Sequence, residues 1–273
     1  MKAKLIAEPA IYWHGDQMIL HNMIDYAAAA QCDMFKYQCF NPERLSPAFQ
    51  PKKKFYSKCQ LDSKSLSDVK SHVEANGMEF VVTVNTPDRF IFMRELGVEN
   101  IKIASGQLHP SLLQELDKYK WKRVIVSTGM LNEADKLDQI REIQSAEEVV
   151  VMHCVSLYPH NDNETNMQRL RSLDKRIGHE TINYVPIVYG YSDHTMDDLA
   201  SVVAVSMGAR YIERHFKTEA CFGPTVQVCC SPAELANFSA TLRRIDSIIG
   251  CGELGMQPRE WNSYEHYKNR FLL

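Results

Sequence analysis

The sequence lacks several features that would assign it to a broad class at once. It has no uninterrupted apolar stretch approaching the ~18 residues of a membrane span, and its first residues lack the apolar core of a signal peptide. The formal net charge is only −3 over 273 residues, so no excess of positive charge indicates nucleic-acid binding. Low-complexity segments and internal repeats are absent as well. We therefore expect a soluble, cytoplasmic protein that binds neither membrane nor nucleic acid.

The eight cysteines lack the spacing of a metal site. None belongs to a CxxC pair, which excludes a zinc ribbon. Several lie in apolar runs, where a free thiol packs as a small hydrophobic group. A chain of this length can bury a large core without disulfides, so we expect reduced thiols.

What the sequence does contain is a regular alternation of short apolar runs and longer amphipathic ones. Their Val- and Ile-rich character is typical of strands covered on both faces. The eight predicted strands are Leu5–Ala10, Met34–Gln38, Phe80–Val84, Ile101–Ser105, Val124–Thr128, Val149–Val155, Ile187–Ser192 and Tyr211–Phe216. The predicted helices are Gln17–Ala30, Ser65–Asn76, Asp88–Leu96, Ser111–Tyr119, Glu133–Ile143, Met167–Ile177, Met196–Met207 and Pro232–Ile249.

Local signals support these helices. Gly77 and Gly97 fit helix C-termini, whereas Asn132 and Ser231 fit N-caps, the latter with Glu234 three residues on. Eight strand–helix units predict a parallel α/β fold. An open doubly wound sheet has the same pattern, but the count of eight favours a closed (β/α)₈ TIM barrel, as one domain over residues 1–273.

One predicted connection, Phe40–Ser63, is unusually long and rich in proline and lysine. A loop of this length is either functional, here on the active-site face, or a solvated surface excursion.

Polar residues gather where the predicted strands end, which in a TIM barrel is where chemistry takes place. Every predicted strand contributes, although a polar atom buried in a barrel without a partner costs a few kcal/mol. A site explains this set better than idle core residues do. Its members are Glu8, Lys36, Gln38, Asn85, Thr86, Lys102, Ser105, Gln107, Ser127, Thr128, His153, Ser156, Tyr158, Ser192, Asp193, His194, Glu213 and His215.

Two lysines indicate an anionic ligand. Lys36 and Lys102 project from apolar strands toward one end of the barrel, and ammonium groups with nearby hydroxyls suit a phosphate and a carboxylate held together. Strand alternation puts Lys102 and Ser105 on opposite faces. Either a bend at the strand end reorients one of them, or one is not a ligand.

Two histidines indicate a divalent metal. His194 and His215 lie at the ends of neighbouring predicted strands, where imidazoles can converge on one ion. Glu213 shares the face of His215, and Asp193 lies beside His194.

A series of motifs in a fixed order carries a resemblance. They are IAE at Ile6–Glu8, MFKYQ at Met34–Gln38, NTPD at Asn85–Asp88, KIASGQL at Lys102–Leu108, VSTGM at Val126–Met130, HCVSLYP at His153–Pro159, GYSDHT at Gly190–Thr195, IERHF at Ile212–Phe216 and GP at Gly223–Pro224. Over Ile6–Ile249 the chain resembles the N-acetylneuraminate (sialic acid) synthase family of the NeuB type, which includes legionaminic, pseudaminic and spore-coat polysaccharide synthases.

The resemblance implies a barrel that condenses phosphoenolpyruvate with a sugar aldehyde at a divalent metal, commonly manganese, with magnesium or cobalt as alternatives. It places phosphoenolpyruvate on Lys36, Thr86, Lys102, Ser105, Ser127, Ser156 and Ser192. It places the metal on His194 and His215. It places the sugar or the reacting centre at Glu8, Gln38, Gln107, Tyr158 and Glu213.

The implied chemistry joins carbon 3 of phosphoenolpyruvate to the aldehyde carbon, which the metal polarises as a Lewis acid. Water then adds at carbon 2, and phosphate leaves by carbon–oxygen cleavage. We expect Glu213 to stabilise the cation at carbon 2 or to guide that water.

The sequence departs from the family pattern where the sugar is expected. Tyr12, Trp13 and His14 replace an Asn-rich turn, Gln107 replaces an acid, and Thr225 replaces an aspartate. We expect no C-terminal antifreeze-like domain, whose arginine normally reaches across a dimer. Either a separate capping chain supplies it, or the acceptor needs none, or the site is degenerate.

We expect a homo-oligomer, because barrels commonly self-associate. Two other interpretations of the function stay open. One is an aldolase that forms a Schiff base on Lys36 or Lys102. The other is a barrel that binds phosphoenolpyruvate or a sugar without catalysis.

Overall fold

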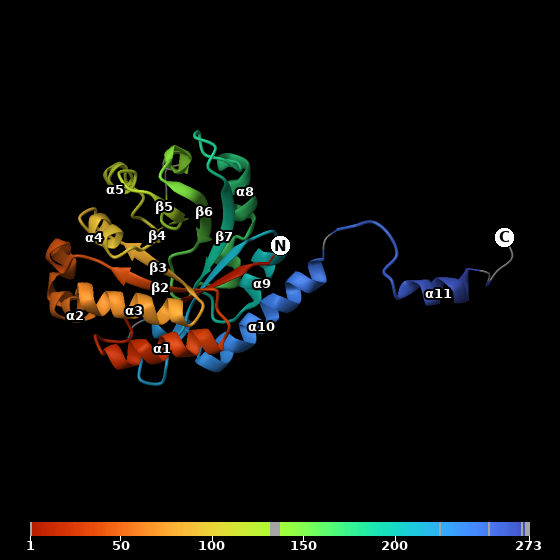
Figure 1. Ribbon diagram of the computed structural model, residues 1–273, viewed down its shortest axis with the longest axis horizontal. Coiled ribbons are helices and arrows are strands. Elements are labelled where there is room, and N and C mark those ends of the chain that lie inside the picture. The colour runs from red at the N-terminus through yellow and green to blue at the C-terminus, as the bar shows by residue number, and fades with distance from the viewer. Residues whose placement is uncertain (1, 132–136, 224, 251, 269, 271–273) are drawn as a thin grey trace.

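Eight parallel strands close into a barrel in the computed structural model, which describes residues 2–131, 137–223, 225–250, 252–268 and 270 (Figure 1). The order is sequential, and β1 pairs with β8 so that Glu8 lies opposite His215. The strands are β1 (Lys4–Glu8), β2 (Met34–Cys39), β3 (Glu79–Val84), β4 (Asn100–Ile103), β5 (Trp121–Ser127), β6 (Ala146–Cys154), β7 (Ile187–Asp193) and β8 (Tyr211–His215). The predicted closed barrel is confirmed.

The barrel interior on the N-terminal side of the cavity is apolar. It also shows which residues further along each strand face inward. It is filled by a layer of side chains from Ile6, Met34, Val81, Ile125, Val150, Met152 and Tyr211. Because successive side chains alternate between the two faces of a strand, residues two further along point inward as well. Glu8, Lys36, Ser127 and Glu213 each lie two residues after a member of this layer, so they face the same interior near its C-terminal end.

Helices surround the barrel and bury their apolar faces against its outer side. They are α1 (Gln17–Ala29), α3 (Ser63–Ala75), α4 (Arg89–Glu95), α5 (Pro110–Leu116), α7 (Asp162–Thr165), α8 (Gln168–Ile177), α9 (Leu199–Ser206) and α10 (Pro232–Ile249). Ser231 caps α10 as predicted: its side chain accepts from Glu234 N, and Glu234 accepts from Ser231 N at 2.7 Å. Gly77 and Gly97 follow helix ends with φ of +77° and +67°, as predicted.

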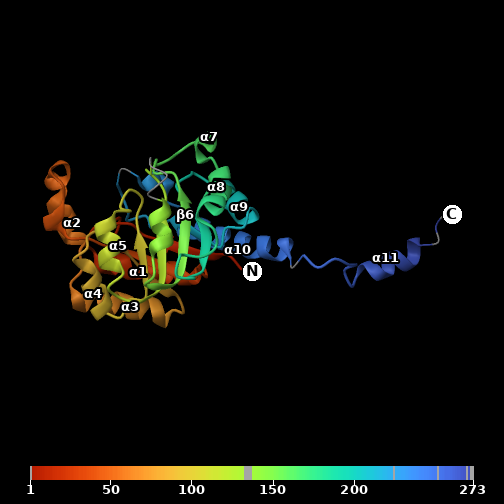
Figure 2. The same cartoon turned by 90° about the horizontal axis from the view of Figure 1, so that it is seen from above.

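The segment Phe40–Ser63 is not the loop that the sequence predicted. It folds into two 3₁₀ helices, η1 (Pro42–Arg44) and η2 (Pro47–Lys52), followed by α2 (Lys53–Cys59). Proline at the first helical positions starts both short helices. Figure 2 shows α2 beside the C-terminal end of the barrel, so the segment does lie on the predicted face.

Two further segments complete the chain. Asn132 and residues 133–136 of one predicted helix lie outside the described residues, and η3 (Gln139–Glu142) covers part of the remainder. Helix α11 (Glu260–Tyr267) extends away from the barrel and buries no side chain (Figure 1). Within the described residues, no helix has both the length and the hydropathy needed to cross a bilayer. Seven cysteines are described, all free and buried.

Candidate functional site

A cavity of about 370 Å³ opens at the C-terminal ends of the strands. It unites twelve of the fourteen residues to which the family resemblance gave a role: Glu8, Lys36, Gln38, Lys102, Ser105, Ser127, Ser156, Tyr158, Ser192, His194, Glu213 and His215. All eight strands or the loops that follow them contribute, which explains why residues so distant in the chain meet here.

Two lysines and two carboxylates form a buried ionic network at the base of the cavity. Glu213 accepts from Lys102 at 2.5 Å and from Ser192 Oγ at 2.9 Å, and Lys36 Nζ lies 2.9 Å from its second oxygen. Lys36 also contacts Glu8 at 2.6 Å. Each of these charged side chains is at most 4% exposed. Two cations thus offset two anions, and the network carries no net charge.

Burial and charge act in opposite directions on these groups. Burial raises the pKa of Glu213, but Lys102 and Lys36 outweigh it and hold the pKa well below its usual range. Burial also raises the pKa of Glu8, but Lys36, His215 and Lys102 together outweigh it and lower that pKa. Burial lowers the pKa of Lys102, whereas the two carboxylates raise that of Lys36 against the same penalty. Both carboxylates are therefore ionised and ready to accept hydrogen bonds.

Three serine hydroxyls form a second group in the cavity. Ser127 Oγ is buried without a hydrogen-bond partner, which is costly unless a ligand supplies one. A Cβ added at Gly129 would come within 2.7 Å of Ser105 Oγ and closer still to Ser156 Oγ. Glycine at this position therefore lets the hydroxyls of Ser105 and Ser156 approach each other, as a bound phosphate requires. Strand β4 ends at Ile103, and this early end lets Ser105 turn inward beside Lys102.

Two imidazoles lie at one side of the cavity, with ring centroids 5.3 Å apart. The Nδ1–H of His194 donates to the Val155 carbonyl at 2.7 Å, which leaves the lone pair of Nε2 free. His215 Nδ1 is buried without a partner, and burial lowers the pKa of His215 to about 4, so this ring is neutral near pH 7. Burial lowers the pKa of His194, but its contacts with Cys154 and the Val155 carbonyl outweigh burial and raise it. A divalent metal would bind the deprotonated Nε2 and displace that proton.

The two histidines do not form a complete metal site by themselves. Among the described residues, no group of three or more His, Cys, Asp or Glu side chains is arranged to hold an ion. Water or substrate oxygens would supply the other ligands, as in sites that keep open positions for chemistry. Tyr158 lies beside the two histidines, with its ring centroid 4.0 Å from that of His194 and the ring planes tilted by 32°.

Several polar residues expected near the site point elsewhere. Thr86 and exposed Gln107 do not line the cavity, because both follow the ends of their strands, where alternation no longer applies. Asp193 faces the helix layer and contacts Arg214, so its carboxylate does not lie in the cavity beside His194 and His215 as expected. His153 also faces outward and pairs with the Thr165 carbonyl at 2.7 Å.

The cavity also contains side chains that sequence reasoning missed. Thr83 and Cys154 line it, and both lie two residues beyond members of the apolar interior layer, Val81 and Met152. The period-2 pattern of each strand was the signal that could have found them. Asn85, noted in the sequence among the polar residues that follow β3, lines the cavity as well.

A wider cavity of about 860 Å³ adjoins the first and shares Gln38, Tyr158 and His215 with it. Its walls include Tyr12, His14 and Thr225, three positions where the sequence departs from the family pattern. Tyr12 hydrogen-bonds Thr225, and the ring of His14 stacks on Phe222 at 3.7 Å. Trp13 is fully buried in the core instead. These departures therefore shape the entrance where a second substrate would approach.

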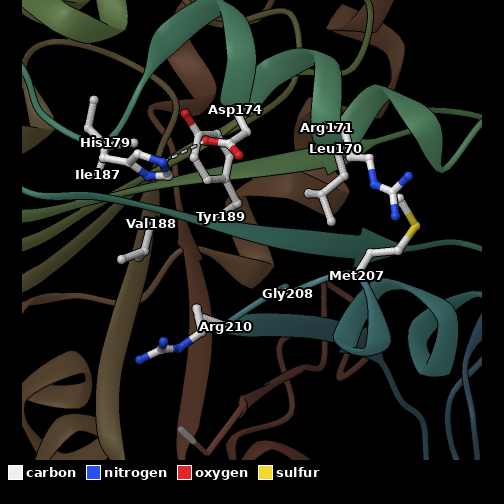
Figure 3. A pocket seen from close by; sticks show the side chains of 10 residues that line it. All are labelled: Leu170, Arg171, Asp174, His179, Ile187, Val188, Tyr189, Met207, Gly208 and Arg210. Atoms are coloured by element: carbon white, nitrogen blue, oxygen red, sulfur yellow. Dashed lines mark ion pairs between the residues drawn. The ribbon is translucent and has the colours of Figure 1, made fainter. Parts of the chain in front are cut away.

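A smaller hollow of about 250 Å³ lies at the opposite end of the barrel (Figure 3). It lies between α8, the start of β7 and the turn before β8, and its Asp174 and His179 form an ion pair at 3.3 Å. Arg171 and Arg210 lie at opposite sides of it in Figure 3. It contains none of the predicted site residues, and its charged groups do not converge.

Comparisons with known proteins agree with this geometry. The family model described as the NeuB family matches residues 23–254. An N,N'-diacetyllegionaminic acid synthase from Campylobacter jejuni is 27% identical over 92% of this chain and 78% of its own. An N-acetylneuraminate-9-phosphate synthase from Mus musculus is 24% identical over 94% and 74%.

Among solved structures, an N-acetylneuraminic acid synthetase from Leptospira borgpetersenii superposes with a TM-score of 0.84. That match has 25% identity and covers 98% of this chain and 92% of the other. The chain therefore belongs to the NeuB family, whose named relatives here are carbon–carbon bond-forming transferases.

Proposed function

We propose that the protein condenses phosphoenolpyruvate with the aldehyde of an amino sugar or related aldose, giving a 2-keto-3-deoxy sugar acid and phosphate. The observation that carries this proposal is the neutral network of Lys36, Lys102, Glu8 and Glu213 beside the serine hydroxyls and the two histidines. The relatives named above make sugar acids of this kind, which supports the same class of product.

The lysines and serines would hold the anionic substrate. An ammonium group has three donors, so Lys36 and Lys102 can keep their carboxylate partners and still donate to phosphoenolpyruvate. The hydroxyls of Ser105, Ser127 and Ser156 would donate to its phosphate. Held in this way, its carbon 3 would face the wider cavity, through which the aldehyde would enter.

Charge stabilisation and the orientation of water fall to the carboxylates. In the overall change, carbon 3 bonds to the aldehyde carbon, and the former aldehyde oxygen takes up a proton to become a hydroxyl. One water oxygen bonds to carbon 2, the bond from carbon 2 to the phosphate oxygen breaks, and a carbonyl forms at carbon 2. The water loses two protons, one to the new hydroxyl and one to phosphate or solvent. Glu213 lines the cavity. Its ionised carboxylate would stabilise a cation at carbon 2 and orient the incoming water by accepting a hydrogen bond from it. Glu8 accepts from Gln38 Nε2 at 2.7 Å and would orient the sugar side.

His194 and His215 would hold the divalent metal, for which we propose manganese, with magnesium or cobalt as substitutes. When bound, this metal supplies Lewis-acid polarisation of the aldehyde oxygen. The Val155 carbonyl keeps the His194 ring in the tautomer that leaves Nε2 free. Thr86 and Gln107 have no part in this proposal, since neither lines the cavity.

The test is phosphate release from phosphoenolpyruvate with manganese and a panel of aldoses. The panel includes N-acetylmannosamine, mannose, arabinose and diacetamido-trideoxy hexoses. We expect release that needs one sugar, the metal and His194, and that is lost in His194→Ala. His179→Ala, at the opposite end of the barrel, serves as the matched control and should keep full activity. Tight phosphoenolpyruvate binding without release from any sugar would instead support a binding protein or a barrel that needs a separate cap.

One observation favours a second candidate, an aldolase that forms a Schiff base. Burial and the neighbouring Lys36 lower the pKa of Lys102, which is how lysine nucleophiles are activated. Borohydride reduction with pyruvate, followed by mass spectrometry, decides between the two. A pyruvyl adduct that Lys102→Arg abolishes would establish the aldolase, whereas an unmodified chain would exclude it.

A further inference from the structure

Directly behind the two metal-binding histidines lies a buried ion pair on the helix-facing side of the barrel. Asp193 and Arg214 are register partners on β7 and β8, and Arg214 Nη1 lies 3.1 Å from Asp193 Oδ2. Their side chains are 0% and 2% exposed. Each residue directly precedes one of the histidines in the chain, His194 or His215.

Further hydrogen bonds fix the carboxylate of Asp193. Its Oδ1 accepts from the backbone N–H of Thr195 at 2.8 Å and from the Thr195 hydroxyl at 2.7 Å. Its Oδ2 accepts from Ser201 Oγ of α9 at 2.5 Å. One side chain thus joins β7, the turn that carries His194, helix α9 and the guanidinium group on β8.

An ion pair is an expensive way to fill this space. Two buried charges lose their hydration, and well-packed apolar side chains are often as stabilising or more so. The helix-facing neighbours of Arg214 are Ile212 on β8 and Phe216 directly after it, so apolar residues are accommodated on either side of Arg214. A charged, hydrogen-bonded pair does fix the relative position of the two strands, because sliding one strand past the other would separate the charges.

We propose that Asp193 and Arg214 are positioning residues for the metal site. By locking β7 to β8 one residue before each histidine, the pair sets the separation of the two imidazoles, whose centroids lie 5.3 Å apart. The proposal rests on the function proposed above, because it assigns a purpose to the geometry of the proposed metal ligands. Neither residue touches the metal or a substrate in this role.

The test is manganese affinity, measured without turnover from the electron paramagnetic resonance signal of free Mn²⁺. The full chain is compared with Asp193→Asn, which is nearly isosteric and removes the shorter ionic contact of Arg214 (3.1 Å), leaving the longer one to Asp198 (3.8 Å). Arg214→Lys is the second variant, because it keeps the charge and loses the reach to Asp193. Glu148→Gln is the matched control. It breaks a cross-strand pair with Arg123, also between register partners (2.7 Å), at the opposite end of the barrel.

We expect Mn²⁺ affinity to fall by about 10- to 100-fold in Asp193→Asn, the range typical for groups that orient metal ligands. A smaller loss is expected in Arg214→Lys, with phosphoenolpyruvate affinity by calorimetry unchanged in both. Glu148→Gln should lower the melting temperature and leave Mn²⁺ affinity at the wild-type value.

Wild-type Mn²⁺ affinity in a folded Arg214→Lys or Asp193→Asn variant would show that the pair is only structural. Equal losses in Glu148→Gln would also overturn the proposal, since the effect would then follow from stability alone. If Asp193→Asn does not fold, Arg214→Lys decides. Failure of the wild-type chain to bind Mn²⁺ would refute the metal site itself, an outcome distinct from the other two.

Discussion

Replacing Glu213 by glutamine is the most informative single change in the ionic network, because it removes one charge and little volume. Glu213 contacts Lys36 at 2.9 Å and Lys102 at 2.5 Å in a fully buried site. At an effective dielectric constant of ~20, the 2.9 Å contact alone corresponds to about 6 kcal/mol of attraction. The variant avoids the desolvation penalty of a buried carboxylate, which offsets part of this loss.

The net cost of breaking such a pair is about 3–5 kcal/mol, because the partner charges stay buried without compensation. We therefore expect the free energy of unfolding of Glu213→Gln, from urea denaturation, to fall by that amount. Without the charge of Glu213, the network of Lys36, Lys102 and Glu8 would carry one net positive charge. Phosphoenolpyruvate should accordingly bind the variant at least as tightly as the wild type, and at 100 times its Kd restore about 2.7 kcal/mol.

Turnover should fall in Glu213→Gln, in contrast to the affinity for phosphoenolpyruvate. If Glu213 stabilises the cation or guides water, kcat should fall by about 10²–10³ while phosphoenolpyruvate still binds. Glu79→Gln is the matched control: that carboxylate also contacts several cations, Lys4, Lys122 and Arg123, but at the opposite end of the barrel. It should lose stability and keep its turnover.

Two results would refute this reasoning. A free energy of unfolding within about 0.5 kcal/mol of the wild type would mean that the network does not hold the lysines as the structure indicates. Near-wild-type turnover with metal bound would remove Glu213 from the chemistry, whatever its effect on stability.

Three further predictions concern other parts of the site and the fold. Gly129→Ala should cost about 1–3 kcal/mol of stability and raise KM for phosphoenolpyruvate, because the added methyl group would displace the hydroxyls of Ser105 and Ser156; an unchanged KM would place the phosphate elsewhere. Burial lowers the pKa of His153 from 6.5 to about 4, so stability is full above pH 6.5 and falls on the order of 3 kcal/mol toward pH 4. In urea titrations at several pH values, His153→Gln should flatten that slope, and a slope equal to the wild type would contradict this assignment. Chelation should abolish phosphate release and Mn²⁺ should restore it, except in His194→Ala; activity that persists in chelator would refute the metal requirement.

The sequence was sufficient to predict the barrel and most of the site because both follow from simple periodicities. Eight alternating units predicted the architecture, and the inward positions of Glu8, Lys36, Lys102 and Glu213 follow from period-2 alternation within strands. The Ser231 cap was likewise predictable, since a capping box depends on residues only three apart.

Only the tertiary structure decided what lies beyond the strand ends. Thr86 and Gln107 follow strands whose alternation has already stopped, so their direction depends on loop geometry that no local pattern encodes. Ser105 turns inward for the same reason, because β4 ends two residues before it. The short helices within Phe40–Ser63 were hidden by their prolines, which mark turns and helix starts alike.

Asp193 shows the same division within one motif. Alternation alone places His194 and Asp193 on opposite faces, yet the carboxylate was expected near the predicted metal site because it adjoins His194 in the sequence. Its true partner, Arg214, lies on the next strand. Sequence determines which face a residue occupies, whereas its partner across strands is set by register, which depends on how the whole barrel closes.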